Sequence, residues 1–373
     1  MSIAIRSFAK INLGLKIGPS RADGFHELRT VYQTIALHDV VRVELADGDG
    51  IEIRCEDARV PLDARNTCWK VAERVLRTFG RQSRVVITIE KRLPVQGGMG
   101  AASSNAVAAM LGLERALGIE LSSPEKMRIA AEVGSDLPLF LIGGTVLGVD
   151  HGQEVYALQD LPEIPMVVVT PPIGVSTPKA FQQWDALVAV HDCDSRTEVR
   201  ESGSKTSGLD AGLKASSIQN RVKEATTESA ALTGPSVTGT IKQFDRAVYA
   251  WLSKCFLSPG GSAEVPASGV PARGGDRAET PLLDRVRTGI ENDFERVVFP
   301  ENPELREVKN VLQREGARYA SLSGSGSTLY GLYDSANEAE AAAERMRGAG
   351  HIALATRTVG RAEYWRELFA LGD

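Results

Sequence analysis

Cysteine, histidine and long apolar runs are scarce in this chain of 373 residues. Its four cysteines and five histidines are scattered, with no C-x-x-C pair and no H-x-x-x-H pattern. We therefore expect no disulfide framework and no protein-held metal, and reduced thiols favour a cytoplasmic location. No apolar run reaches the roughly 18 residues of a membrane span, and the first residues alternate like a strand rather than like a signal peptide.

The chain also lacks an excess of basic residues over acidic ones. The chain has 43 Lys and Arg against 48 Asp and Glu, a net charge of −5. Because nucleic acid favours a strongly basic face, neither nucleic acid nor a membrane is an expected partner. The expected partner is therefore a small molecule. We expect the protein itself to be a monomer or a homodimer.

The length suggests two domains, since a domain typically has about 150 residues. We expect an N-terminal domain over 1–162 and a C-terminal domain over 163–373. Two segments, 189–236 and 258–281, are rich in Ser, Thr and Gly and have little apolar periodicity. They are expected to be mobile surface insertions in the C-terminal domain.

The first half of the chain is predicted to be rich in β-strands, with helices between them. Apolar and polar residues alternate over 3–17, which places Lys10 and Asn12 together on the polar face of a strand. Further strands are expected at 28–37, 39–45, 51–55, 85–90 and 144–149. Helices are expected at 68–78, 105–117 and 124–133.

The C-terminal half shows an alternating pattern of strands and helices. Strands are predicted at 166–170, 318–322, 328–333 and 352–359, and helices at 177–187, 241–257, 303–315 and 337–347. The ordered part gives a β-α-β-β-α-β series, which is the ferredoxin-like order. The fold class is therefore α+β.

The stretch Leu93–Met110 contains a glycine-rich loop followed by an Ala-rich helix. Gly97, Gly98 and Gly100 permit close backbone approach to a ligand, and unpaired N–H groups at a helix N-terminus attract anions. The alternative is a helix-initiating turn with glycines for geometry alone. A Walker A loop is excluded because no Gly-Lys-Ser/Thr follows. The dinucleotide fingerprint is excluded because Ser103 stands where its third glycine belongs.

The loop has the form P-x-x-G-G-x-G-x-x-S-S, and two other motifs accompany it: FAKINLGL at 8–15 and SLSGSGSTLYGLY at 321–333. Together, in this order, they resemble the three motifs of the GHMP small-molecule kinases. Within that superfamily the chain is most similar to the members that phosphorylate a methylerythritol carrying a cytidine diphosphate group. The stretches that carry this closer resemblance are RADGFHEL at 21–28, GSDLPLFL at 134–141 and END at 291–293.

The resemblance implies a GHMP kinase fold, in which a ribosomal-protein-like N-terminal domain precedes the ferredoxin-like one. It also implies ATP as co-substrate, with Mg²⁺ held mainly by the ATP phosphates. The implied ATP-binding residues are Pro94, Val95, Gln96, Gly97, Gly98, Met99, Gly100, Ala101, Ala102, Ser103 and Ser104. Gln96, Ala101 and Ala102 stand where the family often has glycine, so this loop is expected to be stiffer.

Lys10 and Asp136 match the catalytic pair of the family. Taken alone, such a lysine is usually a solvated edge residue, and an aspartate in a Gly-Ser-Asp turn is usually a cap. Phosphoryl transfer needs a carboxylate that orients and deprotonates the attacking hydroxyl. The resemblance assigns that role to Asp136, with Lys10 holding it ionised.

The resemblance also implies an acceptor site and a glycine turn near it. Phe25 stands where the family usually has a tyrosine, so the ring face is kept and the hydroxyl is lost. The second stacking aromatic is Phe181, although Trp184 is an alternative. The implied acceptor-binding residues are Asn12, Phe25, His26, Thr177 and Phe181, and the implied glycine-turn residues are Gly324, Ser325 and Gly326.

Two other functions stay open at this point. The chain could act on mevalonate derivatives, homoserine or a sugar, although RADGFHEL and the two aromatics argue against this. It could also be a nucleotide-binding regulator without catalysis, although Lys10, Asp136 and the Ser103–Ser104 pair argue against that.

Overall fold

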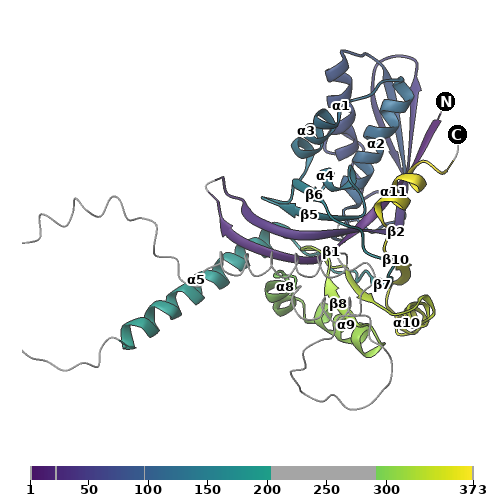
Figure 1. Ribbon diagram of the computed structural model, residues 1–373. Helices are drawn as coiled ribbons and strands as arrows, with labels where there is room; N and C mark the ends of the chain where they lie inside the picture. The colour runs from purple at the N-terminus through teal and green to yellow at the C-terminus, as the bar shows by residue number, and fades with distance from the viewer. Residues whose placement is uncertain (1, 22, 96, 203–290, 372–373) are drawn as a thin grey trace, which may run out of the picture.

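The computed structural model describes residues 2–21, 23–95, 97–202 and 291–371, with side chains described except in 190–202. Two β-sheets, each flanked by helices, make up the fold (Figure 1). The strands of the first sheet are β1 (Ser2–Ser20), β2 (His26–Ala46), β3 (Gly50–Cys55), β4 (Arg84–Glu90), β5 (Thr145–Val149) and β6 (Glu154–Ala157). Its helices are α1 (Thr67–Phe79), α2 (Ala101–Leu117), α3 (Ser123–Val133) and the short α4 (Leu137–Phe140).

In the first sheet β2 is the central strand. It pairs along its length with β1 and, on its other edge, with β4 near its end and β5 near its start. The sequence predicted two strands at 28–37 and 39–45, but the structure has a single strand over 26–46. The pairing of Phe8 with His38 is followed directly by that of Ala9 with Ile35, so β2 bulges at Ala36–Leu37 instead of ending there.

The second sheet contains β7 (Pro165–Val169), β8 (Tyr319–Leu322), β9 (Leu329–Leu332) and β10 (Ala353–Arg357). Its strand order is β10-β7-β9-β8 and all three pairings are antiparallel. Together with its helices this is the predicted ferredoxin-like arrangement. The helices are α5 (Thr177–Ser202), α8 (Glu295–Glu301), α9 (Pro303–Arg314) and α10 (Ala336–Gly348).

Strand β1 contributes to all three apolar clusters of the protein. Ile5 packs under α1 and α2, Ile11 lies in the cluster between the two sheets, and Ile17 joins the core under α8 and α9. Residues on both faces of β1 are buried over most of its length, which lets one strand contribute to three clusters. The last helix, α11 (Arg361–Leu368), returns to β1, where Arg6 pairs with Glu367 (Figure 1).

Two helix predictions were wrong in their bounds. Helix α2 begins at Ala101, not at Asn105, because Gly100 takes the N-cap position with φ +68°; Ser103 and Ser104 are therefore inside the helix. Helix α5 extends to Ser202, well beyond the predicted end at 187 and into the segment 189–236. The rest of that segment, the second segment 258–281 and the predicted helix 241–257 lie outside the described residues. In the described part of the chain, no helix is long and apolar enough to cross a membrane.

Candidate active site

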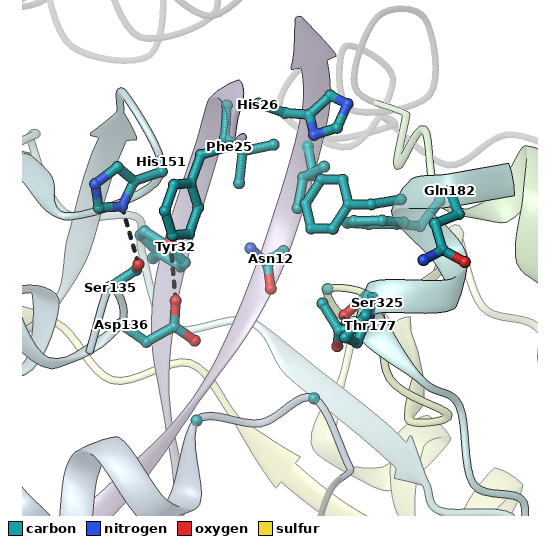
Figure 2. Close-up of a pocket in the computed structure, with 18 of the residues that line it drawn as sticks. Asn12, Phe25, His26, Tyr32, Ser135, Asp136, His151, Thr177, Gln182 and Ser325 are labelled. Atoms are coloured by element: carbon teal, nitrogen blue, oxygen red, sulfur yellow. Dashed lines mark hydrogen bonds between the residues drawn. The ribbon is translucent and has the colours of Figure 1, made fainter. Parts of the chain in front are cut away.

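The larger of two neighbouring cavities, about 670 Å³, is enclosed by β1, β2, the loop before α4, the start of α5 and the turn after β8 (Figure 2). Of the residues predicted from the sequence, it is lined by Lys10, Asn12, Phe25, His26, Gly98, Gly100, Asp136, Thr177, Phe181, Gly324 and Ser325. The fold thus brings the predicted catalytic pair and the predicted acceptor residues to one space.

Lys10 is buried at the floor of this cavity. Its side chain is 4% exposed, and its ammonium donates to Oδ1 of Asn12 at 2.7 Å and to the carbonyl of Gly98 at 3.0 Å. The same ammonium lies 3.4 Å from Oδ2 of Asp136. Lys10 is therefore not a solvated edge residue, since a buried ammonium needs such partners to offset the loss of water.

Asp136 precedes α4 but makes no capping hydrogen bond with its side chain. Its two carboxylate oxygens face other groups instead: Oδ1 accepts from the hydroxyl of Tyr32 at 3.1 Å, and Oδ2 faces Lys10. About a third of the side chain is exposed. An exposed carboxylate oxygen beside a fixed cation can accept a proton from a hydroxyl placed in the cavity.

Two aromatic pairs line the cavity; in Figure 2, Phe25 and His151 lie on the side of Asp136, and His26 lies on the opposite side. The ring of Phe25 stacks on His151, with centroids 5.0 Å apart, and the ring of His26 stacks on Phe181, with centroids 4.8 Å apart. A ring nitrogen of His26 also lies 2.7 Å from Asp185. These flat surfaces suit a planar ligand group. His151 was not found by sequence analysis, because it lies far along the chain from Phe25.

Trp184 was the alternative to Phe181 as a stacking residue. The structure places it in the core under α8, where it is 5% exposed and its ring faces the guanidinium of Arg296. Phe181 lies one turn away on α5 and lines the cavity. The geometry therefore favours Phe181.

The smaller cavity, about 400 Å³, lies against the glycine loop and the first turn of α2. Of the predicted ATP residues it is lined by Pro94, Val95, Gly97, Gly98, Met99, Gly100, Ala101, Ala102 and Ser103. Gln96 lies outside the described residues. Ser104 is buried and lies 2.7 Å from the hydroxyl of Ser7, so its side chain faces the sheet and not this cavity.

Three cations of this smaller cavity were missed from the sequence: Arg59, Arg65 and Lys91. Arg59 pairs with Asp57 and Arg65 with Asp63. The repeated Asp-x-Arg pattern before α1 was a possible signal, but such pairs are usually ordinary surface pairs. Only the fold shows that they border the glycine loop.

Asp39, also missed, fixes the start of the glycine loop. Its fully buried carboxylate accepts from Nζ of Lys91 at 2.6 Å, from the backbone N–H groups of Arg92 and Leu93 at 2.7 Å each, and from the amide of Asn105 at 3.0 Å. Four donors satisfy a buried carboxylate well. They join β2, the loop and α2 at one point.

The C-terminal glycine turn supports the loop from the other side. A Cβ atom on Gly98 would lie 2.3 Å from the carbonyl oxygen of Ser323, and one on Gly326 would lie 2.6 Å from the backbone nitrogen of Gly98. These contacts leave no room for a side chain, which is why both positions are glycine. Gly324 and Ser325 line the larger cavity, whereas Gly326 packs beneath the loop.

The END stretch at 291–293 holds this turn in place. The amide of Asn292 donates to the carbonyls of Leu322 and Gly324, at 2.8 Å each. Asp293 accepts from the N–H of Ile17 at 2.9 Å and pairs with Lys16 at 3.0 Å. Burial raises the pKa of the Asp293 carboxyl, against the opposing effect of the Lys16 charge. The stretch thus ties β1 to the turn.

Gly98 and Gly100 line both cavities, so the two spaces meet at the glycine loop beside Lys10. A glycine loop at a helix N-terminus, adjoining a second cavity that holds a lysine–aspartate pair, is the arrangement expected of a kinase of small molecules. Two family models agree with this class: "GHMP kinases N terminal domain" matches residues 66–144, and "GHMP kinases C terminal" matches residues 280–352.

Curated relatives give the particular family. A 4-diphosphocytidyl-2-C-methyl-D-erythritol kinase of Acaryochloris marina is 30% identical over 346 residues, which cover 92% of this chain and 91% of the relative. The protein of the same name from Solibacter usitatus is 31% identical over 333 residues, covering 89% and 82%. The chain belongs to the 4-diphosphocytidyl-2-C-methyl-D-erythritol kinase family of ATP-dependent small-molecule kinases.

Solved structures agree in fold. A crystal structure of 4-(cytidine 5'-diphospho)-2C-methyl-D-erythritol kinase aligns with a TM-score of 0.62 at 24% identity, covering 96% of this chain and 99% of that one. The homoserine kinase from Cytophaga hutchinsonii aligns with a TM-score of 0.60 at 17% identity, covering 97% and 96%. At these identities the likeness concerns the GHMP kinase fold alone.

Proposed function

We propose that this protein transfers the γ-phosphoryl group of ATP to the 2-hydroxyl of 4-diphosphocytidyl-2-C-methyl-D-erythritol, in the methylerythritol phosphate route to isoprenoid precursors. The observation that carries the proposal is the junction of the two cavities at Gly98 and Gly100. ATP in the smaller cavity would direct its terminal phosphate toward the acceptor hydroxyl, beside Lys10 and Asp136.

The chemical step needs few protein groups. The acceptor oxygen forms a bond to the γ-phosphorus, the bond from that phosphorus to the bridging β-phosphate oxygen breaks, and ADP leaves. Asp136 takes the hydroxyl proton on Oδ2, which is the oxygen that faces Lys10. Lys10 stabilises negative charge at this junction.

The glycine loop binds the triphosphate through backbone N–H groups at the start of α2, where the helix dipole also favours an anion. Arg59, Arg65 and Lys91 line this cavity, but each is paired with an aspartate, so the backbone N–H groups are the main donors to phosphate. Ser103, in the first turn of α2, lines this cavity, and its hydroxyl would donate to an ATP phosphate, while Mg²⁺ would be held mainly by phosphate oxygens. When bound, Mg²⁺ would neutralise charge on the β- and γ-phosphates.

The acceptor end is proposed to hold the cytosine ring between Phe25 and Phe181, with His26 at the ring edge. In this structure His26 covers the face of Phe181, so ligand entry would displace it. Asn12 lies 2.7 Å from the ammonium of Lys10, and we assign Asn12 and Thr177 to the methylerythritol part of the acceptor. The hydroxyl of Thr177 lies 2.7 Å from that of Ser325, which links α5 to the glycine turn.

An ADP-release assay with a panel of acceptors tests the proposal. We expect release with the cytidyl substrate and none with mevalonate, homoserine or a sugar. Asp136→Ala should lower kcat by at least about a hundredfold, because general-base catalysis contributes roughly 10²–10⁴. Both substrates should still bind to it, and Asp47→Ala, at an exposed turn, is the matched control.

Release with another acceptor alone would replace the substrate assignment. Turnover of Asp136→Ala within tenfold of the wild type would overturn the base assignment. ATP binding without release with any acceptor would favour a non-catalytic nucleotide-binding protein. The cytoplasmic location and the oligomeric state remain predictions.

A further inference from the structure

We propose that Tyr32 is a positioning residue for the catalytic base: its hydroxyl fixes one oxygen of Asp136 so that the other is presented to the acceptor. This inference rests on the proposed role of Asp136. Tyr32 belongs to none of the motifs found in the sequence, and it lies in the first half of β2, where β2 pairs with β5.

The contact is geometrically direct. The hydroxyl of Tyr32 donates to Oδ1 of Asp136 at 3.1 Å, as the dashed line in Figure 2 shows. Oδ2 of the same carboxylate lies 3.4 Å from Nζ of Lys10, and that ammonium is 5.4 Å from the centre of the Tyr32 ring. Each carboxylate oxygen therefore has its own partner, which sets the plane of the carboxylate.

The ring of Tyr32 is held by close packing against two glycines. A Cβ atom on Gly148 would lie 2.5 Å from Cε2 of Tyr32, and one on Gly152 would lie 2.7 Å from its hydroxyl oxygen. Gly148 is in β5, which pairs with β2 beside Tyr32. The ring is 3% exposed. A side chain at either glycine would move the hydroxyl away from Asp136.

The hydroxyl can act only as a donor toward this carboxylate. Burial, together with the negative charge of Asp136, raises the pKa of Tyr32 well above its ordinary value. Tyr32 therefore keeps its proton at the pH of catalysis and stabilises the ionised carboxylate. Its hydroxyl hydrogen-bonds to Asp136, so in this proposal it acts through the base.

Tyr32→Phe is the first test, because it removes the hydroxyl and keeps the ring. We expect kcat to fall about ten- to a hundredfold, because a hydrogen bond to a charged group usually contributes a free energy of that size. Both KM values should stay within about threefold of those of the wild type. The acid limb of the kcat–pH profile should move to higher pH, because a carboxylate that loses a donor is protonated more easily.

Gly148→Ala is the second variant, since it keeps the hydroxyl but displaces the ring. It should lower kcat and shift the acid limb in the same direction. Tyr364→Phe is the matched control: Tyr364 is also buried and donates a single hydrogen bond, to the carbonyl of Phe140 at 2.7 Å. Its kcat and its acid limb should stay close to those of wild type.

An unchanged kcat in Tyr32→Phe, or a fall without a shift of the acid limb, would overturn the inference. Thermal melting of each variant separates these outcomes from a loss of folding. Asp136→Ala distinguishes the two proposals: if it stays active, the base assignment fails, and if it is inactive while Tyr32→Phe is normal, only the role of Tyr32 fails.

Discussion

The ammonium of Lys10 lies 3.4 Å from Oδ2 of Asp136, which joins the middle of β1 to the loop before α4. We predict that Lys10→Met lowers kcat by about a hundredfold or more, because it removes the fixed cation at the junction of the two cavities. ADP release at saturating substrates measures the effect. Lys126→Met, which breaks a lysine–carboxylate pair with Glu114 on the helices, should leave kcat unchanged. Equal activity in the two variants would contradict the role of Lys10.

The two aromatics of α5 should behave differently when altered. Phe181→Ala is expected to raise KM for the cytidyl acceptor about five- to a hundredfold, the usual worth of one stacked base, and to leave KM for ATP unchanged. Trp184→Ala should instead lower the melting temperature, because it opens a cavity in the core under α8. Steady-state kinetics and thermal melting separate them. If Trp184→Ala raised KM for the acceptor in a folded protein and Phe181→Ala did not, Trp184 would be the stacking residue.

Gly326→Ala should weaken ATP binding. The added Cβ would lie 2.6 Å from the backbone nitrogen of Gly98, so the glycine loop must move away from the turn that supports it. We expect KM for ATP to rise about tenfold, since a loop displaced by an ångström loses several N–H contacts to phosphate. Gly348→Ala, at the end of α10 with open space around the position, is the control. A normal KM for ATP in Gly326→Ala would show that the turn does not set the position of the loop.

His38 should make the protein less stable in acid. Burial lowers its pKa below the ordinary value of about 6.5, and the nearby charges of Arg92 and Arg6 lower it further, against the opposing effects of the Ala36 carbonyl and Asp39. As the pH falls, the His38 imidazole is therefore protonated in the unfolded chain at a higher pH than in the folded protein. The stability that neutral His38 contributes is fully present above about pH 6.5 and is lost as the pH falls through the folded-state pKa.

His38→Gln should accordingly flatten the fall in the free energy of unfolding between about pH 7 and pH 5. Urea unfolding at a series of pH values measures this slope. Carboxylates contribute to the same slope in every variant, so the comparison is with His351→Gln, a half-buried histidine after α10. An identical slope in His38→Gln and wild type would show that His38 is not linked to folding.

Much of the fold was predictable from local patterns. The alternation in β1 placed Lys10 and Asn12 on one face, and the structure has their side chains 2.7 Å apart. The order of strands and helices after 165 indicated the ferredoxin-like sheet. The errors occurred where local signals conflict with geometry: Gly100 caps α2 although two serines follow it, and β2 passes through a bulge where two strands were expected.

The amino-acid sequence by itself indicated the class of this protein through the resemblance of three motifs, in order, to those of the GHMP kinases. Each motif is recognisable without the fold because its residues are close together in the chain. The tertiary structure alone decided which side chains surround the reacting groups. Tyr32 and Asp39 lie at different points of β2, and Arg59 and His151 lie in turns. Each gains its role through a neighbour that is distant in the chain. No periodicity or motif records such contacts, since they depend on how two sheets and their loops pack together.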